Sequence, residues 1–199
     1  MIACRYPWES PDTDSYPDMN YLLSEGARAR YVIAAHYLRG CRAVLEIGGF
    51  KTPIAGFLTH TPERVLMVDP IVSEYHAEEL NGKPCRVDHV RGRFQEYEID
   101  LPAGEYGMVC LGLSLKHFGE DAARRSREWG KWLSLVGNSR VAIIEYALDW
   151  ALGSELGEQT LAETKADVVM QADLDLSRSP GMDTVHARRR LIVLRPGSH

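Results

Sequence analysis

The 199-residue sequence predicts a single α/β domain, in which a mostly parallel sheet carries helices on both faces and ends in an antiparallel hairpin. Three observations support this class. Short apolar runs typical of buried strands alternate with longer amphipathic segments. Gly, Pro, Asn and Asp residues separate these segments at the spacing of strand–helix units. Finally, the strand-like runs 166–174 and 186–194 flank the turn sequence SRSPGMD, which favours a hairpin.

The chain begins with an irregular arm followed by a helix. Residues 1–20 are rich in Pro, Asp and aromatic residues and show no periodicity. A helix is expected over 21–39, because apolar residues recur there at helical spacing and Gly40 follows as a stop. Its inner face consists of Leu23, Ala27, Tyr31, Ala34 and Leu38.

The remaining elements follow the same logic. Apolar runs predict five strands, over 43–47, 64–69, 86–90, 107–113 and 140–146. Thr52 and Pro53 suit the cap and first position of a short helix, and Asn81-Gly82 suits the end of a helix through 75–80. Two longer helices are expected over 120–136 and 150–164, the first with Trp129, Trp132, Leu133 and Val136 facing inward.

Composition narrows the function classes. The chain is 45% hydrophobic and 26% charged with a net charge of −5, so no basic excess indicates a nucleic-acid partner. The run Arg188 to Arg190 is interpreted as a solvated strand face or edge. The four cysteines, with no C-x-x-C pair, favour small buried side chains in a reducing compartment over disulfides or a metal site. With no leader or membrane-spanning run, the expected location is cytoplasmic, and no membrane partner is expected.

The segment AVLEIGGF, residues 43–50, is a buried strand that runs into two glycines. Open parallel sheets bind ligands outside the carboxyl ends of their strands, and glycine lets the backbone approach a ligand closely. Asp69 ends the next strand, 23 residues after Glu46, where a carboxylate can accept hydrogen bonds from both hydroxyls of a ribose. The alternative is structural: Gly48-Gly49 as a tight turn and Asp69-Pro70 as a turn that ends the strand.

Four segments in this order resemble the class I S-adenosylmethionine (SAM)-dependent methyltransferases, whose fold is Rossmann-like with a final antiparallel hairpin. They are VLEIGGF, VLMVDP, YGMVCLGLSLKHF and VAIIEY, and the resemblance covers nearly the whole chain. It implies SAM as the cofactor. It also implies that Gly48 and Gly49 lie under the methionine and ribose parts, that Glu46 orders the loop or meets the amino group, and that Asp69 binds the ribose. Pro70 and Leu113, at the ends of the matching strands, are further expected cofactor-binding residues, as is Phe50 in the loop.

Two positions depart from the usual pattern of that superfamily. Its glycine loop commonly reads E/D-x-G-x-G-x-G, whereas here Phe50 and Thr52 occupy the second and third glycine positions. After the third strand, Arg93 stands where an acid often meets the adenine amino group. Phe94 or the guanidinium of Arg93 could stack on the adenine instead. The alternatives are a surface charge for Arg93 and a core position for Phe94.

Candidate acceptor residues follow the fourth and fifth strands. His117 could act as a general base, because its ordinary pKa is near the working range, or make a structural hydrogen bond. Glu145 could bind a substrate amine or hydroxyl, or cap a helix, and Tyr146 lies beside it. The arm, with Tyr16 and Tyr21, could fold over the cofactor as a lid that excludes water, or be a disordered terminus.

These features predict a SAM-dependent methyltransferase acting on a small-molecule acceptor, since no bulky insertion precedes the final hairpin. One alternative is another SAM-using enzyme, such as a lyase, a cyclase or an aminocarboxypropyl transferase. Another is a non-catalytic partner subunit with the same fold. A nicotinamide oxidoreductase is disfavoured because G-x-G-x-x-G is absent. The acceptor's identity and the oligomeric state are left open.

Overall fold

In the computed structural model, residues 25–49, 52–72, 74–113, 118, 121–179, 182 and 184–197 are described. They form an eight-stranded sheet in the order β3-β4-β2-β1-β5-β6-β8-β7. Its strands are β1 (Ala43–Ile47), β2 (Arg64–Asp69), β3 (Tyr75–Leu80), β4 (Lys83–Arg91), β5 (Tyr106–Leu111), β6 (Val141–Ala147), β7 (Asp167–Asp175) and β8 (Arg188–Arg195). The predicted arm, 1–20, lies outside the described residues.

The centre of the sheet is parallel, as the apolar runs predicted. β1 pairs in parallel with β2 on one side and β5 on the other, and β4 and β6 continue the sheet outward in parallel. The strand order therefore reverses between β1 and β5, which makes the carboxyl ends of these two strands the point where such sheets bind ligands. The antiparallel pair β7–β8 confirms the predicted hairpin.

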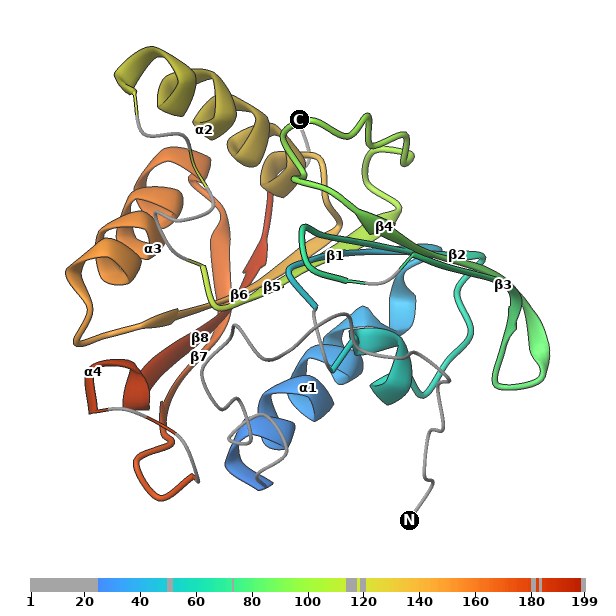
Figure 1. Cartoon of the computed structure of the whole chain (residues 1–199), viewed down its shortest axis with the longest axis horizontal. Coiled ribbons are helices and arrows are strands. Elements are labelled where there is room, and N and C mark those ends of the chain that lie inside the picture. The colour runs from blue at the N-terminus through green and yellow to red at the C-terminus, as the bar shows by residue number, and fades with distance from the viewer. Residues whose placement is uncertain are drawn as a thin grey trace.

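Helices cover both faces (Figure 1). α1 (Glu25–Tyr37) with its 3-10 extension η3 (Leu38–Gly40) and the single 3-10 turn η4 (Ile54–Phe57) lie on one face, and α2 (Ala122–Gly137) and α3 (Ala151–Thr164) on the other. The short α4 (Thr184–Ala187) precedes β8. Ala27, Tyr31, Ala34 and Leu38 form the buried face of the first helical segment, as expected, and Trp132 and Val136 are buried on α2.

The prediction of a helix over 75–80 is wrong. These residues form β3, an edge strand antiparallel to β4, because Asn81 and Gly82 adopt φ angles of 54° and 73°. Two consecutive residues with positive φ make the two-residue turn that matches the twist of a hairpin. Asn-Gly is a hairpin signal as well as a helix stop, and here the hairpin is the outcome.

The helix expected after the glycine turn is reduced to η4. Thr52 does not cap it: the residue before η4 is Pro53, and no side chain caps the turn. The Thr52 hydroxyl instead lies 2.5 Å from the Tyr31 hydroxyl, in a buried hydrogen bond. The loop after β1 is therefore anchored to α1 rather than to a long helix of its own.

Two further observations concern the described residues. None of their helices is long and apolar enough to cross a membrane. Cys41, Cys85 and Cys110 are buried free thiols, and burial raises the pKa of each. Cys4 lies outside the described residues.

Candidate functional site

The glycine turn at the end of β1 has a strict steric requirement. Gly48 has a φ of +78°, and its N–H donates to the Val68 carbonyl at 3.0 Å, which ties the turn to β2. A Cβ added at Gly49 would lie 2.3 Å from Met67 Sδ and 2.6 Å from Glu46 Cδ. Real Cβ atoms do not approach that closely, so both glycines are needed for the turn to hold this shape.

Glu46 lies beneath this turn and is 2% exposed. Its Oε2 accepts a hydrogen bond from the Ile54 N–H at 2.8 Å, so the carboxyl group orders the end of the loop. Burial raises the pKa of Glu46 to about 8, the hydrogen bond from Ile54 opposes that rise, and the charge of Asp69 adds to it. Glu46 is therefore a buried acid that titrates close to neutral pH.

Asp69 is the last residue of β2 and lies level with Gly48, because Ile47 pairs with Val68 in the parallel register. The residue is 4% exposed, and its Oδ1 accepts the Ile71 N–H at 2.8 Å. Pro70 follows in an exposed turn. Two acids thus flank a glycine turn at the carboxyl edge, which is the arrangement expected from the sequence.

Arg93 and Phe94 lie beyond β4. The Arg93 side chain is part-buried and forms an ion pair with Glu128 of α2 at 3.3 Å. Phe94 is in the core, where its ring contacts Phe118 and Trp132 edge-on. Phe94 thus has the core position named as its alternative, and Arg93 is a part-buried ion-pair partner. A contact of either residue with adenine stays a prediction.

On the other side of the point where the strand order reverses, the residues that follow β5 are hydrogen-bonded to β6. Gly112 and Leu113 both donate their N–H groups to the Glu145 carbonyl, at 2.9 and 2.8 Å. Gly112 has a φ of +111°, and Leu113 is buried in the core. The end of β5 is therefore fixed beside the glycine turn.

The Glu145 carboxylate is completely buried and lies between two arginines. Arg30 of α1 donates from Nη1 to Oε2 at 2.6 Å, and Arg189 of β8 donates from Nε to Oε1. Arg30 and Arg189 are only 1% and 6% exposed. We call these three residues the Glu145 triad. Both carboxylate oxygens accept bonds within the protein, so the predicted contact of Glu145 with substrate has to compete with this ion cluster.

Tyr146 points to the opposite face of the sheet. It is buried in the core under α3, and its hydroxyl donates to Glu158 at 2.9 Å. The structure therefore does not bring Tyr146 together with Glu46, Asp69 and Glu145. His117, Phe50, Tyr16 and Tyr21 lie outside the described residues, and their roles stay predictions.

Four residues at this edge were missed by the sequence analysis as site residues: Arg30, Tyr31, Thr52 and Arg189. Tyr31 was assigned to the core, yet its hydroxyl meets Thr52 and its ring stacks on Phe57 at 4.6 Å. The alternation of side chains along a strand could have predicted that Arg189 faces inward. Arg189 shares a face of β8 with Leu191 and Val193, which are both fully buried. The interpretation of the arginine run as solvated was wrong for this middle residue.

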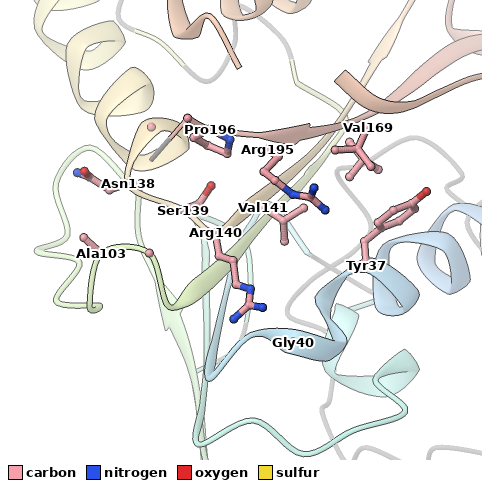
Figure 2. A pocket seen from close by; sticks show the side chains of 14 residues that line it. Tyr37, Gly40, Ala103, Asn138, Ser139, Arg140, Val141, Val169, Arg195 and Pro196 are labelled. Atoms are coloured by element: carbon pink, nitrogen blue, oxygen red, sulfur yellow. The ribbon is translucent and has the colours of Figure 1, made fainter. Parts of the chain in front are cut away.

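A cavity of about 690 Å³ lies elsewhere, at the amino ends of the parallel strands (Figure 2). It opens between α1, the end of α2 and the end of β8, and its lining includes Tyr37, Asn138, Arg140, Val169 and Arg195. The glycine turn and the Glu145 triad lie at the carboxyl ends of the same strands. The cavity is therefore separate from the candidate site.

No family model matches the chain, and no curated protein matches it by sequence. Solved structures do match its fold. The N-methyltransferase NodS from Bradyrhizobium japonicum WM9, in complex with S-adenosyl-L-homocysteine, is similar with a TM-score of 0.60 and 13% identity, over 88% of this chain and 89% of that one.

Two further structures extend the comparison. The 1,6-didemethyltoxoflavin-N1-methyltransferase of Burkholderia thailandensis has a TM-score of 0.56 at 17% identity, over 87% of this chain and 79% of that one. The 23S rRNA methyltransferase ErmE has a TM-score of 0.52 at 15% identity, over 86% and 69%. The chain therefore has the class I methyltransferase fold, as its sequence predicted, and this fold serves both small-molecule and RNA acceptors.

Proposed function

We propose that this chain binds SAM at the carboxyl ends of β1 and β2 and transfers its methyl group to a small-molecule acceptor. The observation that carries the proposal is the glycine turn between two buried acids, Glu46 and Asp69, at the point where strand order reverses. The residues fit the cofactor, because a ribose diol and an ammonium group both require acceptors, and carboxylates supply them.

Each acid has a distinct proposed role. Asp69 is level with Gly48 and accepts hydrogen bonds from the ribose hydroxyls. Gly48 has no side chain and so leaves room for the ribose. Glu46 holds the loop through Ile54 and accepts the cofactor's ammonium group directly or through water. Its pKa of about 8 means that a bound cation would favour ionisation of a group that is largely protonated at neutral pH.

Bound SAM would supply a methyl group on a sulfonium, a good leaving group. The protein's part is to align the acceptor atom in line with that methyl group and to exclude water. The end of β5, fixed by the Gly112 and Leu113 hydrogen bonds, forms the rigid wall nearest the reaction. His117 follows in the same loop and is proposed to take the acceptor's proton, if the acceptor carries one.

The small-molecule acceptor is favoured by charge. NodS is an N-methyltransferase by name, and the Burkholderia enzyme was crystallised with the small molecule 1,6-didemethyltoxoflavin, whereas ErmE is a 23S rRNA methyltransferase. An RNA substrate calls for a basic surface, and this chain has a net charge of −5. A small acceptor also suits a site whose described walls are short strand ends.

Asp69→Ala tests the cofactor site by isothermal calorimetry with S-adenosylhomocysteine. We expect binding to weaken by ~1.5–3 kcal/mol, the scale of hydrogen bonds to a charged group. Asp100→Ala is the control, because Asp100 is exposed and contributes its backbone carbonyl, not its carboxylate, to a bond with Arg64. Wild-type affinity in a folded Asp69→Ala protein would remove the ribose assignment.

Product analysis separates the chemistries. Methyl transfer yields S-adenosylhomocysteine, whereas a lyase or an aminocarboxypropyl transferase releases methylthioadenosine. The one-turn η4 and the missing glycines are the features that favour such an altered reaction. If neither SAM nor S-adenosylhomocysteine binds, the proposed function is overturned and the alternative of a non-catalytic partner subunit is favoured.

A further inference from the structure

The Glu145 triad carries an excess positive charge. Two arginines face one glutamate, all three residues are at least 94% buried, and they join α1, β6 and β8 at the carboxyl edge of the sheet. A buried charge is costly unless an opposite charge or several hydrogen bonds compensate it. One of the two guanidinium charges therefore has no carboxylate of its own within the triad.

Arg189 is the arginine of the triad with an unused hydrogen-bond donor. Its Nε is engaged by Glu145, and its Nη1 donates to the His186 carbonyl at 3.3 Å. Among the described residues Nη2 has no hydrogen bond, yet it is not one of their buried polar atoms that lack a partner, so it borders accessible space. One donor of a rigid, permanently charged group thus faces outward.

That space lies beside Gly112. A Cβ added at Gly112 would find Arg189 Nη2 at 3.6 Å and no other described atom within 4 Å. The opening is next to the end of β5 and on the same face of the sheet as Glu46, but nearer to β6 and β8 than to the glycine turn. It therefore belongs to the side of the site where an acceptor would approach.

The other nearby acid does not cancel this charge. Glu46 also lies near the carboxyl end of a strand at this edge, and, after burial, the charges of both Glu145 and Glu46 raise the pKa of the Cys110 thiol. Because burial raises the pKa of Glu46 to about 8, most of it is protonated at neutral pH. Arg188 and Arg190, the chain neighbours of Arg189, pair with Asp149 and Asp173, so these two acids are already engaged.

We propose that Arg189 Nη2, beside Gly112, is the donor of an anion-binding subsite in the acceptor half of the site, and that the methyl acceptor carries a carboxylate or phosphate group. The acceptor assignment rests on the proposed function. Arg30 and Glu145 hold the guanidinium in place, so the anion meets a pre-organised donor and little side-chain entropy is lost on binding. A charge-assisted hydrogen bond of this kind also selects against neutral analogues.

Inorganic phosphate is the first probe. Thermal unfolding of the full chain is followed with rising phosphate at constant ionic strength, and the wild type is expected to show a saturable rise of the midpoint. Arg189→Lys keeps the positive charge facing Glu145 but lacks the second nitrogen, so the phosphate Kd should rise about tenfold or more. Arg188→Lys is the matched control and should respond like the wild type, since Arg188 is exposed and pairs with Asp149.

Two ligands distinguish the source of the anion. S-adenosylhomocysteine has a carboxylate and methylthioadenosine has none, so calorimetry with both shows whether Arg189 meets the cofactor. The proposal expects Arg189→Lys to leave both affinities within about twofold of wild type. If the substitution weakens the binding of S-adenosylhomocysteine but not of methylthioadenosine, Arg189 binds the cofactor's carboxylate and the acceptor assignment is overturned.

A measurement without substitutions covers the case in which Arg189→Lys fails to fold. Wild-type crystals soaked in selenate should show an anomalous peak within hydrogen-bond distance of Arg189 Nη2. An absent peak, no saturable phosphate response, or an equal response in Arg189→Lys overturns the subsite. Loss of S-adenosylhomocysteine binding in the wild type would instead count against the proposed function, while a phosphate response would still stand.

Discussion

Glu46 and Glu145 occupy comparable places and are stabilised in opposite ways. Both lie near the carboxyl ends of parallel strands, on the α1 face of the sheet, with only β5 between their strands, and both are buried. Glu145 is matched by two arginines, whereas the hydrogen bond found at Glu46 comes from a neutral backbone N–H. Glu145 therefore has two cationic partners, whereas burial raises the pKa of Glu46 to about 8, so that Glu46 is largely protonated at neutral pH.

The contrast separates a structural carboxylate from one available to a ligand. The charge of Glu145 is already committed to linking α1, β6 and β8, so its removal should act mainly on folding. Glu46 becomes charged at the cost of its burial, and a bound cation would offset that cost. Within the triad, the donor that makes no hydrogen bond among the described residues is Nη2 of Arg189.

Replacement of Glu145 should produce the largest effect. Glu145→Ala leaves Arg30 and Arg189 buried without their acid, and breaking such a pair costs about 3–5 kcal/mol of the free energy of unfolding. Urea unfolding followed by circular dichroism measures the loss. The control is Glu63→Ala, which removes an exposed partner of Arg42 and should change stability little. Equal, small losses in both variants would show that the triad is not a structural link.

The glycine turn should respond next. Gly49→Ala places a Cβ against Met67 and Glu46, and overpacking of this kind costs about 1–3 kcal/mol of the free energy of unfolding. The displacement of Glu46 should also weaken the binding of S-adenosylhomocysteine, as measured by calorimetry. Gly92→Ala is the matched control at the end of β4, where an added Cβ meets no described atom within 4 Å. Tolerance of both alanines would mean that the turn relaxes freely.

The smallest effect concerns the pH dependence of stability. Glu46 has a pKa of about 8 in the folded protein and 4.5 as its ordinary value, so between these values the folded state holds a proton that the unfolded state has lost. The contribution of Glu46 to stability is therefore complete below pH 4.5 and is lost as pH rises toward 8.

Glu46→Gln should remove this loss. The free energy of unfolding of the variant, relative to wild type, should increase by at most about 1.4 kcal/mol between pH 6 and 7, as measured by urea titrations at each pH. A constant difference across the range would show that Glu46 titrates at an ordinary pKa, and its contrast with Glu145 would then disappear.

The sequence was least informative where one signal serves two structures. Asn81-Gly82 ends helices and also turns hairpins, and β3 formed because the preceding residues could pair with β4. The arginine run was likewise ambiguous. Arg188 and Arg190 have exposed or part-exposed partners, while Arg189 between them faces α1, and only the position of Glu145 explains why a charge is accepted there.

Local sequence was enough to predict the class of fold, the order of the parallel strands along the chain, the final hairpin and the glycine turn between Glu46 and Asp69. These depend on local periodicity and turn chemistry, which neighbouring residues encode. By contrast, the contacts among Arg30, Glu145 and Arg189, and the space that Gly112 leaves beside Arg189, depend on how the elements pack. These residues are 44 to 115 positions from Glu145 or belong to different strands, so their contact exists only after the sheet and α1 have packed.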